Sequence, residues 1–203
     1  MISLEHKFIF IHIPRTGGTT IQYLLNGFSE DESSCPTDAF IAPKIVPCKY
    51  ISNLAKEKQI DIINYTHFTA KNYLDILGED YFDYKVFTFV RDPIIKSSSL
   101  QRFNGHAIGS TIAPDREWSY LQKRYVVDDS NNSIVDRIFR YEDFDNEVFE
   151  MFDWLNLSPP CPLPPPVLNC IIEQERNTCS YDENKVNELK ELFKEDMDYF
   201  NYE

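Results

Sequence analysis

A short apolar run near the amino terminus, followed at once by a glycine-rich turn, constrains the fold more than any other feature. Residues 8–13 are almost entirely apolar, which is typical of a strand buried on both faces of a parallel sheet. Residues 14–20 have the sequence Pro-Arg-Thr-Gly-Gly-Thr-Thr, and Ile21, Leu24 and Leu25 then recur at helical spacing. The sequence therefore predicts a strand, a tight turn and a helix, in that order.

The residues of this turn have the chemistry of a phosphate site. Gly17 and Gly18 allow the backbone to approach an anion closely, and the start of the following helix attracts negative charge. Thr19 and Thr20 add hydroxyl donors, and Arg15 adds a fixed positive fork. A Walker A loop is excluded, because the cation precedes the glycines. Gly-Gly turns also follow strands without binding anything, but the apolar run and the two threonines favour phosphate binding.

Length, composition and charge indicate a soluble globular protein. The 203 residues suffice for one α/β domain, and 42% apolar and 26% charged residues are ordinary values. No stretch approaches the ~20 apolar residues that span a bilayer, and residues 1–7 leave no room for a signal peptide, so we expect a cytoplasmic protein. The net charge of −13 argues against nucleic acid and against a highly sulfated glycan as partners.

The cysteines form no metal or disulfide pattern. There are five of them and no C-x-x-C pair, at Cys35, Cys48, Cys161, Cys170 and Cys179. We therefore expect free thiols in a reducing compartment, without zinc and without a disulfide framework.

A second motif follows another predicted strand. Residues 84–90 are rich in aromatic and β-branched residues, and Arg91-Asp92-Pro93 comes directly after them. Asp92 is a good N-cap and Pro93 a good first helical residue, so a helix is expected to start here. Arg91 would stand at the carboxyl end of a strand, where open α/β sheets bind ligands. Without other evidence, the simpler interpretation of this motif is a surface arginine that precedes a helix. The glycine-rich loop upstream favours a ligand-binding role instead.

Together the two motifs resemble those of sulfotransferases of the carbohydrate and heparan-sulfate type, which use 3′-phosphoadenosine 5′-phosphosulfate (PAPS). The usual first loop of that family is Pro-Lys-Thr-Gly-Gly-Thr-Thr, so Arg15 departs from it at one position. The resemblance implies that Arg91 and Ser99, eight residues apart, bind the 3′-phosphate of the donor. It also implies a 5′-phosphosulfate site made by Arg15, Thr16, Gly17, Gly18, Thr19 and Thr20.

The fold expected from this resemblance is a single sulfotransferase domain over residues 1–203. It would be an α/β, three-layer, P-loop-like fold with a central parallel sheet flanked by helices. Residues 60–65 are expected to add a second strand, and residues 70–77 a short helix that ends at Gly78. Ser180 and Glu183 have the spacing of a capping box and predict the start of the last helix.

Sulfuryl transfer needs a base for the acceptor's proton, and histidine suits that duty near neutral pH. His6 lies near the terminus, and the position of His12 inside the first predicted strand favours a core or edge role. His67, after the second predicted strand, is the preferred base, since family members carry a histidine in a similar place; it could also merely cap the strand. His106 is the reserve. Arg15 would stabilise the departing phosphate oxygen.

We therefore expect an enzyme that moves a sulfuryl group from PAPS to a hydroxyl or amine of a sugar or small-molecule acceptor, without a metal. One alternative is a catalytically inactive nucleotide-binding module with the same fold, consistent with Arg15 and the few basic residues. A small-molecule kinase is a weaker alternative, because a Walker lysine and an obvious magnesium aspartate are absent from the sequence. The sequence identifies neither the acceptor nor the oligomeric state.

Overall fold

The computed structural model describes residues 1–34, 44–103, 121–162, 179 and 181–203. The strands in these residues are β1 (Ile2–Ser3), β2 (Phe8–Ile11), β3 (Glu32–Ser34), β4 (Lys44–Val46), β5 (Lys85–Val90) and β6 (Arg137–Arg140). The α-helices are α1 (Gly18–Leu25), α2 (Lys49–Glu57), α3 (Ala70–Leu77), α4 (Pro93–Phe103), α5 (Phe144–Leu155), α6 (Glu183–Leu192) and α7 (Lys194–Phe200). The 3₁₀ helices are η1 (Asn26–Phe28), η2 (Tyr65–His67), η3 (Gly78–Asp83), η5 (Lys123–Tyr125) and η6 (Tyr141–Asp143).

Four of these strands form a mixed, mostly parallel open sheet in the order β1-β2-β5-β6. β2, β5 and β6 run parallel, and β1 pairs with β2 in the antiparallel sense. Ile11 lies opposite Thr88, and Val90 lies opposite Arg140, so the three parallel strands end at the same side of the sheet. We call that side, with the loops and helix starts that follow the strands, the carboxyl edge. The predicted α/β class is confirmed.

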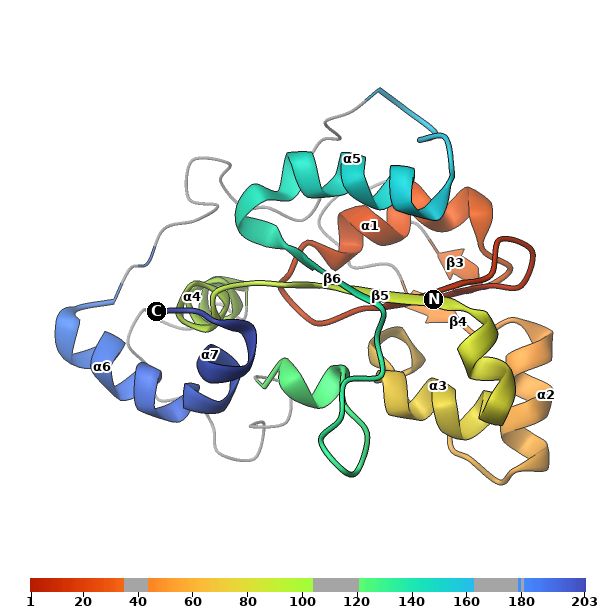
Figure 1. Ribbon diagram of the computed structural model, residues 1–203, viewed down its shortest axis with the longest axis horizontal. Helices are drawn as coiled ribbons and strands as arrows, with labels where there is room; N and C mark the ends of the chain where they lie inside the picture. The colour runs from red at the N-terminus through yellow and green to blue at the C-terminus, as the bar shows by residue number, and fades with distance from the viewer. Residues whose placement is uncertain (35–43, 104–120, 163–178, 180) are drawn as a thin grey trace.

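Helices cover both faces of this sheet. In Figure 1, α1 and α5 lie above it and α2 and α3 lie below it, while α4, α6 and α7 gather beyond the carboxyl edge. All four residues of β2 are fully buried, as the apolar run predicts. The ring of Phe87 stacks on Phe10, with centroids 5.3 Å apart, and meets the ring of Phe139 edge-on at 5.9 Å. These rings pack the three parallel strands together and fix the position of the carboxyl edge.

The residues expected at helix ends predicted the start of α4 and the end of α3 correctly. Helix α4 begins at Pro93, and Asp92 Oδ1 accepts the N–H groups of Ile94 and Ile95 at 2.8 and 3.0 Å. Helix α3 covers the predicted residues and ends at Gly78, whose φ of 65° is easy only for glycine.

The predicted second strand over residues 60–65 is wrong. Gln59 and Asn64 have φ angles of 57° and 59°, in the left-handed region, so the backbone turns at both ends of the segment. Ile63 is 71% exposed, which does not suit a strand inside a sheet. Asn64 is the N-cap of η2 instead, because asparagine tolerates the left-handed conformation that starts this turn.

The predicted capping box at residue 180 is also wrong. Ser180 lies outside the described residues, and Asp182 caps α6 by accepting the N–H of Lys185. The last helix predicted from this point is divided in two, because α6 ends at Leu192 and α7 begins at Lys194. Asp196, in the first turn of α7, is fully buried. The carboxyl-terminal segment thus brings a carboxylate into the interior.

Two further findings concern membrane-spanning helices and the cysteine thiols. No helix in the described part of the chain has both the length and the apolar character needed to cross a bilayer. Cys48, Cys161 and Cys179 are free thiols, and Cys35 and Cys170 lie outside the residues that the structure describes.

Candidate functional site

The loop between β2 and α1 makes a tight turn at the start of the helix. Arg15 and Gly17 have positive φ angles of 67° and 84°. Gly17 is the N-cap of α1, and its carbonyl accepts the N–H groups of Thr20 and Ile21 at 2.9 and 3.3 Å. A Cβ on Gly17 would lie 2.5 Å from Cε2 of Phe144, so a side chain would not fit there. The glycine is needed for both the turn and the close packing.

The threonines of this loop have different surroundings. Thr16 is fully buried and its hydroxyl donates to the Ile13 carbonyl at 2.9 Å, so this hydroxyl stabilises the loop itself. Thr20 is also fully buried, whereas Thr19 is partly exposed. The N–H groups of Gly18 and Thr19 stand in the first turn of α1, ahead of the helix's own hydrogen bonds. Within the predicted set, these backbone groups are better suited to an anion than the Thr16 hydroxyl.

The two predicted phosphate motifs meet in space. Nε and Nη2 of Arg15 donate to Ser99 Oγ at 3.1 and 3.0 Å, across 84 residues of sequence. Nη1 of Arg91 donates to the carbonyl oxygen of Arg15 at 3.2 Å. Arg91 is 4% exposed and Ser99 6% exposed. These three residues form a connected group at the carboxyl edge, which we call the arginine–serine cluster.

Arg91 is held by two residues that sequence reasoning missed. The ring of Tyr141 lies against its guanidinium, with 4.3 Å between Cζ and the ring centroid. The amide of Gln122 accepts the backbone N–H of Arg91 at 2.9 Å and donates to its carbonyl at 2.7 Å. Tyr141 follows β6 immediately, so a search of strand ends would have found it. Gln122 lies in a segment without periodicity and gives no signal.

A buried lysine adds a third cation to this edge. Lys96 lies on α4, one helical turn before Ser99, and is 2% exposed. Burial lowers the pKa of Lys96 to about 8; the charge of Arg91 also lowers it, and the Asp196 carboxylate opposes the shift. Lys96 is therefore still mostly protonated at neutral pH. The spacing of Lys96 and Ser99 was visible in the sequence, but its burial was not.

His67 lies beside the loop, although it ends a 3₁₀ turn rather than a strand. Its Nδ1 is 3.1 Å from the carbonyl oxygen of His12. A carbonyl only accepts hydrogen bonds, so Nδ1 carries the proton and Nε2 of the neutral ring keeps its lone pair. Burial lowers the pKa of His67 below its ordinary value of 6.5, and the bond to the His12 carbonyl opposes that shift. The ring is therefore neutral near pH 7, as a base must be.

The His12 side chain belongs to the packing of the loop. His12 is 5% exposed, and the centroid of its ring lies 4.7 Å from that of the His67 ring. A Cβ on Gly18 would lie 1.9 Å from Cδ2 of His12, so the ring occupies the space beside that glycine. Burial first, and then the nearby His67, hold the pKa of His12 well below its ordinary value. His12 lies just after β2 rather than inside it, in a core position.

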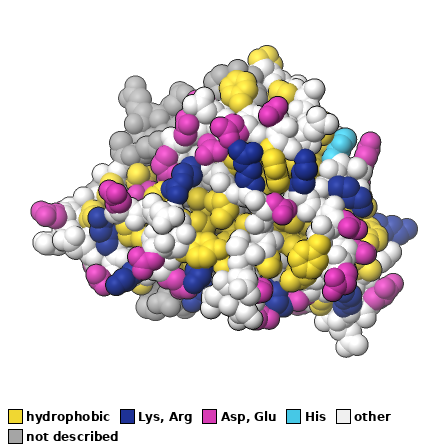
Figure 2. All heavy atoms as spheres, in the orientation of Figure 1, with side chains coloured by type: hydrophobic (Ala, Val, Ile, Leu, Met, Phe, Trp, Pro, Cys, Tyr) yellow, Lys and Arg dark blue, Asp and Glu magenta, His cyan; other side chains and the backbone are white. Residues whose placement is uncertain are grey.

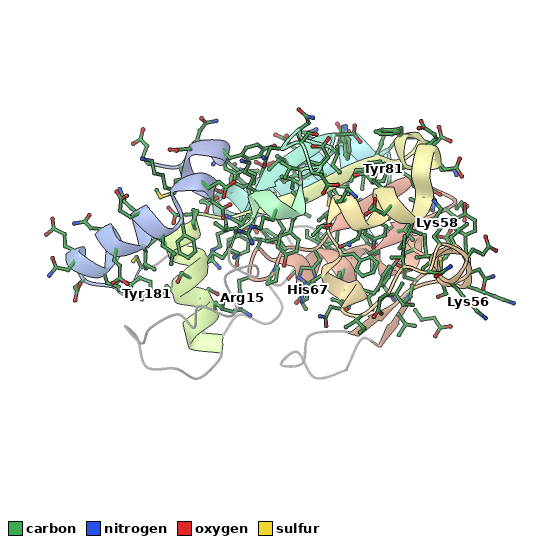
Figure 3. All side chains as sticks on the ribbon, turned by 90° about the horizontal axis from the view of Figure 1, so that it is seen from below. Arg15, Lys56, Lys58, His67, Tyr81 and Tyr181 are labelled. Carbon is green, nitrogen blue, oxygen red and sulfur yellow. The ribbon has the colours of Figure 1, made fainter. Side chains whose placement is uncertain are left out.

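Of the remaining histidines, the structure describes His6 alone, and it lies apart from His67 and Arg15 in a contact with Phe28. In Figure 3, Arg15 and His67 lie on the same side of the molecule. His6 packs edge-on against Phe28, with ring centroids 5.4 Å apart. His106, the reserve candidate, lies outside the described residues.

The carboxyl edge holds Arg15, Arg91 and Lys96, although the molecule as a whole is acidic. The net charge is −13, and the face shown in Figure 2 carries cations and carboxylates interspersed around a central apolar area. In the residues that the structure describes, no group of three or more His, Cys, Asp or Glu side chains comes together as a metal site. The carboxyl edge thus offers cations, helix-start amides and a neutral imidazole, a set suited to an anionic ligand and to proton removal.

No family model, no curated protein and no solved structure matches this chain. The functional interpretation therefore rests on the geometry of these residues and on the resemblance of the two motifs.

Proposed function

We propose that this protein is a PAPS-dependent sulfotransferase with a P-loop-like fold, acting on a hydroxyl or amine of a sugar or small-molecule acceptor. The contact between Arg15 and Ser99 supports this best. It joins the loop that would hold the 5′-phosphosulfate to the helix that would hold the 3′-phosphate. One nucleotide carries both groups, so the two motifs have to adjoin if they serve one donor. A cytoplasmic location and the absence of a nucleic-acid partner are part of the proposal.

The donor would be held at three points. The first N–H groups of α1, at Gly18 and Thr19, would bind oxygens of the 5′-phosphosulfate. Arg15 would bridge both motifs, since its side chain already reaches Ser99. Arg91, buried against Tyr141, and Ser99 would receive the 3′-phosphate. A dianion at this position would offset the cost of burying the Arg91 and Lys96 charges.

The chemical step assigns different duties to His67 and Arg15. Nε2 of His67 would accept the proton of the acceptor hydroxyl while the acceptor oxygen forms a bond to sulfur. The bond between sulfur and the bridging phosphate oxygen would break, and its electron pair would stay on that oxygen. Arg15 would stabilise the resulting phosphate through charged hydrogen bonds. Arg15 keeps its own proton at any useful pH, so it acts by charge alone.

A catalytically inactive nucleotide-binding module is the second candidate. Both Arg15 and Arg91 have partners within the protein, as they would in a site that binds without reacting. This candidate shares the donor pocket and differs only in turnover.

The proposal is tested with the donor and its product. The bisphosphate 3′-phosphoadenosine 5′-phosphate should raise the melting temperature equally with EDTA and with magnesium. Stabilisation that requires magnesium would favour the kinase alternative, and no stabilisation would refute the proposal. Sulfate transfer from labelled PAPS across a panel of sugars, phenols and amines then separates the enzyme from the inactive module. Tight binding without transfer to any acceptor would favour the module.

A further inference from the structure

The backbone at the end of β5 is held by a side chain from a distant segment. Gln122 accepts the N–H of Arg91 at 2.9 Å and donates to the carbonyl of the same residue at 2.7 Å. Gln122 is fully buried, so water does not compete for either bond. An amide that binds both polar groups of one residue imitates a neighbouring strand and fixes the peptide planes on both sides of that residue. The direction in which the Arg91 side chain leaves the backbone is thereby fixed.

Gln122 is itself held from the carboxyl-terminal helix. Oδ2 of Asp196 accepts the N–H of Gln122 at 2.7 Å, and Oδ1 accepts the N–H of Lys123 at 2.9 Å. Asp196 thus binds the start of η5 with both oxygens while fully buried. Burial raises the pKa of Asp196, and these two N–H groups and Lys96 oppose the rise. A continuous polar chain runs from α7 through Gln122 to Arg91.

This chain has a matched counterpart at the other end of the same strand. Oδ2 of Asp136 accepts the N–H of Val86 at 2.7 Å, and the N–H of Asp136 donates to the Val86 carbonyl at 2.7 Å. Both ends of β5 are therefore fixed by the same kind of reciprocal bonding. Only the end held by Gln122 carries a residue of the candidate site.

We propose that Gln122 and Asp196 are positioning residues that determine specificity for a 3′-phosphorylated nucleotide by orienting Arg91. The inference rests on the proposed role of Arg91 in the proposed function. Arg91 must place Nη1 on the Arg15 carbonyl and Cζ 4.3 Å from the centre of the Tyr141 ring at the same time. A small rotation of the peptide at the end of β5 would break both contacts, because the guanidinium lies several bonds from the backbone. Recognition of the 3′-phosphate would be lost while contacts of the 5′-phosphate loop persist.

The test compares affinities for 3′-phosphoadenosine 5′-phosphate and for adenosine 5′-monophosphate by calorimetry on the full chain. The variants are Gln122→Met, which keeps length and removes both bonds, Asp196→Asn, and Asp136→Asn as the matched control. We expect Gln122→Met to reduce the preference for the bisphosphate at least tenfold and to leave monophosphate affinity within about twofold. Asp196→Asn should act in the same direction and more weakly, because one of its oxygens remains. Asp136→Asn should leave the preference unchanged.

The ratio of the two affinities distinguishes a positioning role from a structural one, because loss of a merely structural residue would weaken the binding of both nucleotides together. A wild type with a clear preference, and a Gln122→Met variant that keeps it, would overturn this inference and leave the proposed function standing. A wild type without any preference would overturn the proposed function and this inference with it. If Gln122→Met does not fold, Gln122→Asn replaces it, because its amide is one methylene too short to make both bonds. We expect Gln122→Asn to lose the same preference for the bisphosphate. An unchanged ratio of the two affinities in Gln122→Asn overturns the inference.

Discussion

The two edges of the parallel sheet hold their cations in opposite ways. At the edge where the strands begin, Lys85 donates to the Trp154 carbonyl at 2.6 Å, and Arg137 forms an ion pair with Glu150. Both of these contacts lie at exposed positions, where such pairs contribute little to stability. At the carboxyl edge, Arg91 and Lys96 are almost fully buried.

Burying a cation is costly, and the lowered pKa of Lys96 is the sign of that cost. Of these lysine and arginine contacts, those at the edge where the two motifs meet carry this cost. Preorganised cations in a site that excludes water stabilise an anion more strongly than cations surrounded by water do. The difference between the edges is thus what we expect if one of them is a ligand site.

The largest effect is expected from His67→Ala. Loss of a general base should lower single-turnover sulfate transfer by about 10²–10⁴-fold and leave bisphosphate affinity nearly unchanged. His6→Ala, at the start of the chain and packed on Phe28, is the matched control and should transfer at the wild-type rate. The rate should also fall on acidification with a midpoint below 6.5, because burial lowers the pKa of His67 and the ring must be neutral to accept a proton. A wild-type rate in His67→Ala would move the search for the base to His106.

Arg15→Ala should affect both binding and turnover. The variant loses charged hydrogen bonds worth roughly 1.5–3 kcal/mol, so affinity for the bisphosphate should fall by about 10–100-fold, with a parallel loss of transfer rate. Arg15→Lys should keep most of the activity, since it restores a cation and the residue usual in the family that the loop resembles. Arg137→Ala, at the opposite edge, should change neither quantity. If Arg15→Ala and Arg137→Ala lowered bisphosphate affinity and transfer rate equally, the carboxyl edge would be no more of a ligand site than the opposite edge.

Gly18→Ala should destabilise the loop through a steric collision. The new methyl group would lie 1.9 Å from the His12 ring, and such overpacking costs about 1–3 kcal/mol of the free energy of unfolding. Gly27→Ala is the matched control, because no atom lies within 4 Å of a Cβ there. Urea denaturation measures both variants. A Gly18→Ala variant as stable as Gly27→Ala would show that the His12 ring does not occupy that space.

The smallest effect concerns pH and Lys96. The pKa of Lys96 is lowered to about 8 in the folded protein from 10.5, so the unfolded chain binds more protons between these values. Stability should therefore rise with pH in that window, by about 1 kcal/mol between about pH 7.5 and 9. Lys96→Met should abolish this rise while other titrations remain. Identical pH profiles for the wild type and Lys96→Met, measured by urea denaturation, would show that Lys96 is not desolvated.

How much of the fold the sequence predicts depends on whether a segment's structure is set locally. The helix at residues 70–77 and the start of α4 have their own caps, in Thr69, Gly78 and Asp92, and both were predicted to the residue. Residues 60–65 have enough apolar residues for a strand, but left-handed Gln59 and Asn64 prevent it. Nothing in the apolar pattern reveals those angles.

The candidate site shows the same division. The residues on the two motifs were found from the sequence, because each motif is a continuous segment at a strand end. Tyr141, Gln122 and Asp196 reach Arg91 only through the tertiary fold, and their contacts span 31 to 74 residues of sequence. The sequence predicts His67 at the end of a strand; the structure has no strand there, and η2 places His67 beside the loop instead.

The central claim is that the carboxyl edge binds one nucleotide through two phosphate groups, and calorimetric titration in EDTA tests it most directly. The wild type should bind 3′-phosphoadenosine 5′-phosphate at least about tenfold more tightly than adenosine 5′-monophosphate, the worth of one charged hydrogen bond or more. Arg91→Ala should remove most of that preference while monophosphate affinity persists. Equal affinity of the wild type for the two nucleotides, or an equal loss of both in Arg91→Ala, would contradict the account.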